Sequence, residues 1–321
     1  MPPNTAPDIP RLVAAGQPPP QLAQSAALVA AALLPGALAF NLPPSPTLFN
    51  QVAAVGCYGL VLMLLAGARA VGPGLALHRT APLQAAMALA GAAALWSWLG
   101  GVLPAGLALP PLGLLVMVMA LAAAGSAVSA AGAVPAALFA GWLVAGGFSA
   151  LVGVVQVFAP ELPDGDWIAR SGAPGRAVGN LRQPNHLSSL LLWSAVSVIP
   201  LLEMQRRRRW AGAALFALMV LGVTLSGSRT GLVGIGVLAL WGLVDRRLTR
   251  FSRGLLLAAP LLCAASCVLT AWWASTHDAH AIGAAARIGE GDISASRFAI
   301  WRDTLGQIGR ASCRERVCYA V

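Results

Sequence analysis

Long apolar runs separated by short polar segments dominate the pattern of this chain. Most runs approach the roughly 20 residues that a helix needs to cross the hydrocarbon core of a bilayer. None alternates apolar and polar positions as the strands of a membrane barrel do. We expect nine membrane-spanning helices, at residues 22–40, 51–68, 82–99, 110–130, 134–158, 186–202, 211–225, 230–244 and 254–273. The pattern predicts an all-α polytopic membrane protein with about nine transmembrane helices.

Composition indicates the same fold class. Of the 321 residues, 58% are hydrophobic and only 10% are charged, whereas soluble domains carry roughly 25% charged residues. This excludes a soluble enzyme and a disordered scaffold. The five cysteines show no metal-ligand spacing, and three possible ligands at 277–280 lie in a loop and form only a weak pattern. We therefore expect no metal site, and the family resemblance described below implies that no cofactor is needed.

The positive charge indicates how the helices are oriented. The net charge is +10, and the 21 basic residues are all arginines. Many gather in the short loops at 206–209 and 246–253. Cytoplasmic loops of membrane proteins are enriched in arginine and lysine, so we expect both loops and, by alternation, the N-terminus to be cytoplasmic. This topology accounts for the charge without a nucleic-acid partner.

The same alternation divides the chain into parts. A polar, proline-rich lead at 1–21 is expected to be disordered and cytoplasmic. A transmembrane helical domain follows at 22–273 and includes an outward-facing loop at 159–185. The start of a large outward-facing loop follows at 274–310. A tight hairpin at 226–231 is the third segment that we expect on the outer side.

The densest polar stretch outside the lead runs over 176–186, directly into the sixth apolar run. Pro184 suits the first turn of that helix, because its missing N–H needs no partner there. The polar side chains would then gather at the outer membrane boundary, beside a helix N-terminus that favours anions. The candidate binding residues are Arg176, Asn180, Gln183, Asn185 and His186. The alternative interpretation is an ordinary polar cap and interface loop.

A second candidate is the hairpin 226–231, between two apolar runs. A tight hairpin requires turn residues but no arginine, yet Arg229 lies in it. Ionisable groups at this depth cost several kcal/mol unless they are paired or hydrated, and many of them are functional. The alternative is an arginine that snorkels to the outer interface.

A third candidate is the amphipathic stretch 294–303, in which Trp301 suits a membrane interface. Arg297 and Arg302 are suited to binding an anion. The alternative is that Arg302 and Asp303 form a surface ion pair of little energetic weight. All three outward segments thus offer arginine, the side chain best suited to bidentate phosphate recognition. Together they predict a phosphorylated lipid or a lipid-linked ligand at the outer boundary.

The same segments carry a family resemblance. The run at 179–187, Gly-Asn-Leu-Arg-Gln-Pro-Asn-His-Leu, resembles the signature of bacterial protein O-oligosaccharyltransferases of the pilin glycosylation ligase type. The hairpin 226–231 and the pattern Ser-Arg at 296–297 with Ile-Trp-Arg at 300–302 resemble motifs of the wider O-antigen ligase and polymerase superfamily. The resemblance extends over roughly residues 140–309, in matching order and spacing.

The resemblance implies a GT-C-like glycosyltransferase in the bacterial inner membrane, with its active site in the periplasm. Such an enzyme transfers a preassembled oligosaccharide from undecaprenyl pyrophosphate to a serine or threonine of a periplasmic protein such as pilin. It needs neither a metal nor a nucleotide sugar. The implied catalytic residues are Arg229 and Gln183. The implied substrate-binding residues are Arg176, Asn180, Asn185, His186, Arg297 and Arg302.

Two other functions are alternatives. A lipid A-core O-antigen ligase or an O-antigen polymerase would share the donor chemistry and differ in the acceptor. The run Gln-Pro-Asn-His at 183–186 favours the protein acceptor. A non-catalytic transporter of lipid-linked glycans would predict charged residues at mid-depth in the spans, whereas here they concentrate at one outer boundary.

The end of the chain departs from the family pattern. In the family, a Pro- and Gly-rich stretch and a functional histidine follow the third motif, and further spans come after them. Residues 311–321 resemble none of these, and we expect them to be a tail that is foreign to the native protein. The expected general-base histidine would lie beyond residue 321, so the chain as written is expected to be inactive.

Overall fold

The computed structural model describes residues 19–37, 55–61, 77–101, 103–128, 133–172, 174–277, 282–284 and 302–303. Its long helices are α1 (Pro19–Ala37), α3 (Leu77–Leu99), α4 (Ala105–Val128), α5 (Ala133–Phe158), α6 (Pro184–Met204), α7 (Arg209–Ser226), α8 (Arg229–Val244) and α9 (Arg250–Thr276). A 3₁₀ turn, η2 (Arg206–Arg208), precedes α7, and a short helix covers 55–61. No strand occurs among the described residues.

Each of the nine predicted spans corresponds to one of these helices. Among the described residues, six helices are long and apolar enough to cross a membrane: Thr80–Leu99, Ala105–Ser126, Ala136–Phe158, Pro184–Met204, Arg209–Ser226 and Arg250–Thr276. Two shorter apolar helices, Ser25–Ala37 and Arg229–Val244, match two further predictions. The helix at 55–61 lies within the predicted span 51–68, of which the remainder is outside the described residues. The predicted all-α polytopic membrane protein is confirmed.

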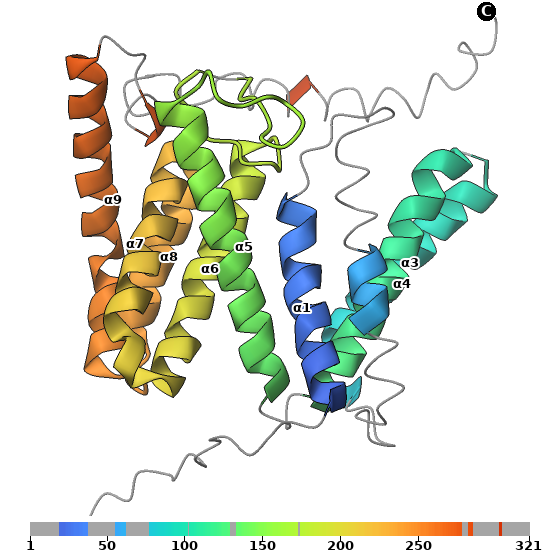
Figure 1. Ribbon diagram of the computed structural model, residues 1–321. Coiled ribbons are helices and arrows are strands. Elements are labelled where there is room, and N and C mark those ends of the chain that lie inside the picture. The colour runs from blue at the N-terminus through green and yellow to red at the C-terminus, as the bar shows by residue number, and fades with distance from the viewer. Residues whose placement is uncertain are drawn as a thin grey trace, which may run out of the picture.

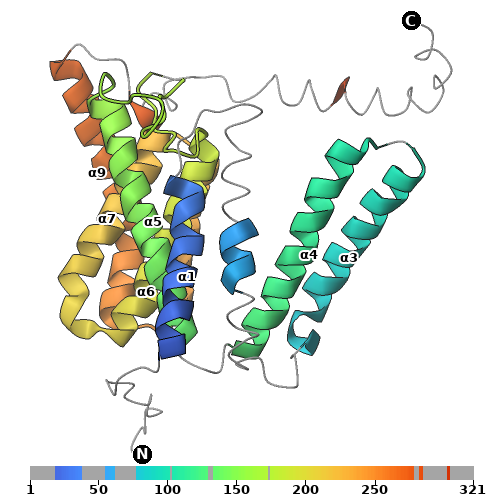
Figure 2. The ribbon, with the colours of Figure 1, turned by 45° about the vertical axis from the view of Figure 1, so that its right-hand side comes forward.

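Helices α5 to α9 form one bundle, and α1 packs along α5 at its edge (Figure 1). Helices α3 and α4 pack against each other as an antiparallel pair that stands beside the bundle (Figure 2). Along the length that would cross a membrane, none of the residues of α3 is buried, whereas 56% of those of α6 are buried. The bundle therefore contains the main core, and α6 lies at its centre.

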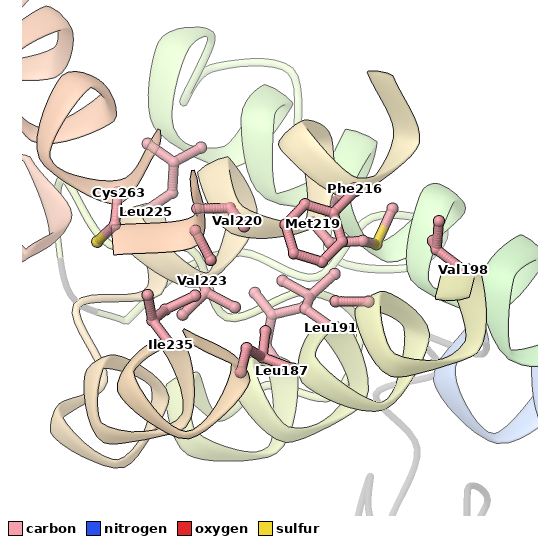
Figure 3. Packing of buried hydrophobic residues seen from close by; sticks show 14 of the residues in the cluster. Leu187, Leu191, Val198, Phe216, Met219, Val220, Val223, Leu225, Ile235 and Cys263 are labelled. Carbon is pink, nitrogen blue, oxygen red and sulfur yellow. The ribbon is translucent and has the colours of Figure 1, made fainter. Parts of the chain in front are cut away.

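The core is formed mainly by facing side chains of α6 and α7 (Figure 3). Leu187 and Leu191 of α6 are fully buried, as are Phe216 and Met219 of α7. Small residues allow the helices to approach closely, as in other membrane bundles. A Cβ atom on Gly222 of α7 would lie 2.7 Å from Cδ1 of Leu191, so a larger residue there would have to displace the Leu191 side chain.

The two ends of the bundle differ in composition. One end, which we call the loop end, carries the loop 159–183, the α7–α8 turn at 227–228 and the segment 282–284. Backbone hydrogen bonds join the loop to the last turn of α7 and to the segment 282–284. The opposite end, which we call the arginine end, carries the connections 205–208 and 245–249 (Figure 1). The predicted outward segments thus share one end, and the arginine-rich loops share the other. Which side of the membrane each end faces stays a prediction.

Several predicted parts fall largely outside the described residues. The lead at 1–21 is described only from Pro19, where α1 begins. Of the predicted loop 274–310, the structure describes 274–277, 282–284 and 302–303, and it describes nothing of the tail 311–321. The division of the chain into these parts, and the GT-C-like architecture, stay predictions.

Candidate functional site

Helix α6 begins where the sequence predicts. Pro184 lies at the start of the helix, and Gln183 is its N-cap with the extended backbone angles φ −144° and ψ 126°. The Gln183 side chain makes no capping hydrogen bond, and Gln183, Asn185 and His186 are all exposed. Three predicted site residues therefore lie together at an N-terminus that leaves first-turn N–H groups for a ligand.

The α7–α8 connection is a tight turn that also ends in a helix N-terminus. Gly227 has φ +58°, the left-handed conformation that glycine adopts most readily at the end of a helix. Ser228 is the N-cap of α8, and its Oγ accepts a hydrogen bond from the Gly231 N–H at 3.2 Å. Arg229, the first residue of α8, is exposed, as is Thr230.

One hydrogen bond joins these two helix starts. Ser228 Oγ donates to Asn185 Oδ1 at 2.8 Å, and it also lies 2.8 Å from Thr230 Oγ1. Gly231 lets the helices approach, because a Cβ there would lie 2.9 Å from Cβ of Ser188. The two sequence motifs, far apart along the chain, therefore form a single polar surface made of two helix N-termini. We call this surface, formed by Gln183, Asn185, His186, Arg229 and Thr230 with the buried Ser228 between them, the twin N-terminus.

A buried glutamine on α5 holds the loop beside this surface. Gln156 is 3% exposed. Its Nε2 donates to the carbonyls of Ala169 at 2.5 Å and Gly179 at 3.2 Å, and its Oε1 accepts from the N–H groups of Val178 at 2.9 Å and Gly179 at 2.8 Å. Sequence reasoning missed this residue. The available signal was a single amide in the last turn of an otherwise apolar helix.

Asn180 differs from the other residues of its motif, because its side chain is 1% exposed. Its Oδ1 accepts from the Ala169 N–H at 3.0 Å, and its Nδ2 donates to the carbonyls of Ala37 at 2.7 Å and Trp167 at 2.9 Å. These contacts tie the loop to itself and to the end of α1. Asn180 is therefore buried and does not lie on the exposed surface with Gln183. A role of Asn180 in binding substrate stays a prediction.

Arg176 connects the loop to the α7–α8 turn. Its Nε and Nη2 donate to the Ser226 carbonyl at 3.2 and 3.1 Å, and Nη2 also donates to the Gly227 carbonyl at 3.3 Å. These are carbonyls at the C-terminal end of α7, where a cation is favourable. The neighbouring Ala177 N–H donates to the Leu225 carbonyl at 3.0 Å. Arg176 therefore fixes the turn that carries Arg229.

The first part of the loop is organised by Asp164. Its Oδ1 accepts from the N–H groups of Ile168 at 3.0 Å, Trp167 at 2.9 Å and Asp166 at 3.0 Å. These hydrogen bonds, that of Ile168 above all, lower the pKa of Asp164 below its ordinary value. Arg182, with φ +57°, donates from Nη2 to the Gly165 carbonyl at 3.1 Å. The loop is thus held by side chains that bind its own main chain.

A segment that follows α9 packs against the same region. The Gly283 N–H donates to the Gly175 carbonyl at 2.8 Å, and Gly283 is buried with φ +54°. A Cβ on Gly283 would lie 2.9 Å from Cα of Leu225. Glycine is therefore required here by both the backbone conformation and the close approach.

An apolar cavity of about 370 Å³ opens beside His186. It lies between α1, the helix 55–61, α5 and α6. His186 and Ser189 are polar groups in its wall, and the other lining residues are Ala31, Ala32, Pro35, Gly36, Tyr58, Trp142, Leu181, Leu190 and Trp193. A second cavity of about 320 Å³ lies under the loop, next to Arg170 and Trp273.

The remaining predicted residues do not reach this site in the described part of the chain. Arg297 lies outside the described residues. Arg302 Nε lies 3.9 Å from Asp303 Oδ1, and the two side chains are 83% and 67% exposed, so they form a surface pair. His277 stacks on Trp273 with ring centroids 4.6 Å apart. The described residues contain no group of three possible metal ligands.

Comparison with known families adds one finding. A family model described as protein glycosylation ligase matches residues 177–202, which include the end of the loop and most of α6. Asn180, Gln183, Asn185 and His186 lie in this stretch. The short match supports similarity to protein glycosylation ligases and a glycosyltransferase-type activity. No curated protein and no solved structure matches the chain.

Proposed function

We propose that this protein transfers a preassembled oligosaccharide from undecaprenyl pyrophosphate to a serine or threonine of periplasmic proteins such as pilin. The observation that carries the proposal is the 2.8 Å hydrogen bond between Ser228 and Asn185. It joins the stretch that matches protein glycosylation ligases to the hairpin that holds Arg229. The twin N-terminus is the proposed donor site.

The chemistry of the twin N-terminus suits a pyrophosphate. The N-termini of α6 and α8 each carry partial positive charge and unsatisfied N–H groups. Arg229 adds a guanidinium group that can bind phosphate oxygens in bidentate fashion. Gln183 and Asn185 supply amides that can orient glycan or pyrophosphate oxygens. An anion is therefore the ligand that this surface favours.

The apolar cavity beside His186 suits the lipid part of the same donor. Its volume is about 370 Å³, and its walls are the apolar faces of α1, α5 and α6. An isoprenoid chain in this cavity would lie at membrane depth with its pyrophosphate at the loop end. His186 lies where the two parts meet.

In the proposed reaction, the acceptor hydroxyl oxygen attacks the anomeric carbon of the glycan. The bond between that carbon and the pyrophosphate oxygen breaks, and the hydroxyl proton passes to a general base, for which the family resemblance predicts a histidine in the large loop. Arg229 stabilises the negative charge that develops on the leaving pyrophosphate. Arg176 positions the turn that carries Arg229. Asn180, Arg297 and Arg302 stay predicted substrate contacts.

The first experiment measures glycan transfer in a bacterial strain that makes a lipid-linked oligosaccharide and lacks its own ligase. The gene is expressed from its complete genomic locus, with a pilin-like protein and a lipid A-core acceptor both present. Arg229→Ala should lower transfer by about 10²- to 10³-fold, as expected for removing one group that stabilises transition-state charge. Arg246→Ala, an exposed arginine at the other end, is the matched control and should transfer normally.

Two outcomes would contradict the proposal. Unchanged transfer by Arg229→Ala, with equal membrane insertion, would remove Arg229 from the chemistry. Glycan on lipid A rather than on the pilin-like protein would identify an O-antigen ligase. The protein acceptor is favoured because the matched family is described as a protein glycosylation ligase.

A further inference from the structure

A third cavity lies at the arginine end, far from the twin N-terminus. Its volume is about 270 Å³, and it lies between the end of α6 and the starts of α7 and α9. Its lining residues are Leu202, Arg209, Thr249, Arg250, Phe251 and Ser252. It therefore combines two guanidinium groups, two hydroxyls and two apolar side chains in one small volume.

The two guanidinium groups of this cavity form no ion pair within the described part of the chain. Arg209 and Arg250 are exposed, and within the described residues neither has a carboxylate within ion-pair distance. The Glu203 carboxylate lies next to two of the lining residues. Its Oε1 accepts from Thr249 Oγ1 at 2.8 Å and Ser252 Oγ at 2.5 Å. The cavity therefore holds two guanidinium groups that have no direct ion-pair partner, and the Glu203 carboxylate lies next to the hydroxyls that line it.

The backbone adds to this positive potential. Helix α7 begins at Arg209, and α9 begins at Arg250. The N-terminus of a helix favours an anion. At α9 the Glu203 carboxylate already accepts a hydrogen bond from the Thr249 N–H at 3.1 Å, whereas α7 adds its N-terminus to the arginine side chains of the cavity. The surrounding segments 203–209 and 245–253 hold eight arginines and two acidic residues. This arrangement favours an anion as the ligand.

The apolar part of the surroundings distinguishes a lipid from a free anion. Leu202 and Phe251 line the cavity, and Phe251 packs edge-on against Trp210 with ring centroids 5.8 Å apart. Trp210 is 71% exposed. An exposed tryptophan at the end of a membrane helix is typical of the head-group level of a bilayer. A ligand with a phosphate next to acyl chains fits both parts.

We propose that this cavity binds the phosphate of one anionic phospholipid, with Arg209 and Arg250 on the phosphate oxygens and the acyl chains against Leu202 and Phe251. Basic pockets between membrane helices are known to take such head groups. The site is independent of the proposed glycan transfer, and it fixes the relative positions of α6, α7 and α9 at this end.

The test uses the full chain, purified in detergent and stripped of lipid, and measures thermal unfolding during titration with phosphatidylglycerol, phosphatidylcholine or inorganic phosphate. Phosphatidylglycerol should raise the midpoint temperature, and the other two should not. Arg209→Gln with Arg250→Gln should weaken this apparent affinity about 25-fold, because each arginine near an anionic lipid contributes a roughly fivefold change. Arg246→Gln with Arg247→Gln removes the same charge outside the cavity and should bind nearly normally.

Three results would overturn the proposal. Equal weakening in both double variants would mean that the surface attracts anions diffusely. Equal stabilisation by phosphatidylcholine would remove the requirement for charge, and equal stabilisation by inorganic phosphate would make a free anion the ligand. If the Arg209→Gln, Arg250→Gln variant unfolds, cross-linking of the unaltered protein with a photoactivatable phosphatidylglycerol tests where the lipid binds. The label should fall on peptides that contain 202, 209–210 or 249–252, and labelling elsewhere alone would refute the site.

Discussion

Arg176 and Arg250 lie at opposite ends of the bundle, and their guanidinium groups are used differently. Arg176 is half-buried and donates to two main-chain carbonyls. Arg250 is exposed, and its side chain makes no hydrogen bond or ion pair with the described residues. At the loop end, Arg176 holds the backbone in place through its hydrogen bonds. At the arginine end, the charge of Arg250 is available to bind a ligand. Side chains at the loop end should therefore be sensitive to any change of shape, and those at the arginine end only to a change of charge.

The largest loss of stability should come from removing the glutamine that holds the loop end. Gln156→Leu would leave two buried N–H groups and two carbonyls without their partner, and it should destabilise the protein by about 3 kcal/mol. Glycan transfer should fall with it, because the loop carries the start of α6. Thermal unfolding in detergent, alongside the transfer assay, measures both effects.

Ser149→Ala is the matched control for that substitution. Ser149 lies on the same helix, and its buried Oγ has no hydrogen-bond partner in the described structure. Its removal should therefore change stability very little. If both variants unfold at the same temperature as the unaltered protein, the hydrogen bonds of Gln156 do not hold the loop.

The next largest effect should come from Arg176→Ala. This variant loses the hydrogen bonds to the Ser226 and Gly227 carbonyls, and we expect a loss of about 2 kcal/mol with stronger proteolysis of the loop 159–183. Arg176→Lys should restore only part of this, because an ammonium group cannot span both carbonyls as the planar fork does. Limited proteolysis and unfolding measure the difference.

An arginine-to-alanine substitution at the arginine end is the control for Arg176→Ala. Arg246→Ala should leave both stability and proteolysis unchanged, since Arg246 is exposed and makes no ion pair with the described residues. An equal loss in the two variants would show that arginine acts in the same way at both ends.

A smaller effect is expected where the two motifs meet. Ser228→Ala removes the N-cap of α8 and the bond to Asn185, and it should destabilise the protein by about 1 kcal/mol. Ser228→Thr keeps the hydroxyl and should stay close to the unaltered protein. In a double-mutant cycle with Asn185→Ala, the two effects should be less than additive, and full additivity would mean that the hydrogen bond contributes nothing.

The smallest expected effect is a pH dependence of the loop. The pKa of Asp164 is lowered mainly by the N–H of Ile168. The folded state therefore has the lower pKa, so the carboxylate stabilises the loop above its ordinary pKa and loses this effect as the pH falls through the folded value. Cleavage of the loop by an acid protease should increase only below about pH 4. Asp164→Asn should show no such step, and an identical step in that variant would assign it to another group.

The helices could be predicted from the sequence, because the length of an apolar run and a proline at a helix start are local signals. Pro184 marks the start of α6 as predicted, and each of the nine spans has a helix. The loop contacts could not be predicted. Gln156 and Asn180 bind main-chain groups of a loop whose path no periodicity encodes, so one of them was missed and the other was expected on the surface. Charge patterning located the arginine end, but it did not indicate that two helix starts there enclose a cavity.

The contact of Gly283 with Gly175 has a consequence for how the protein is made. The two glycines lie on either side of four α-helices, α6 to α9, in the chain. During synthesis, α6 and α8 can enter the membrane and pair before Gly283 has left the ribosome. The loop receives this main-chain partner only after α9 and the segment behind it have been made. Assembly of the loop end is therefore coupled to the completion of α9, and a chain paused after α8 would present the twin N-terminus without this contact.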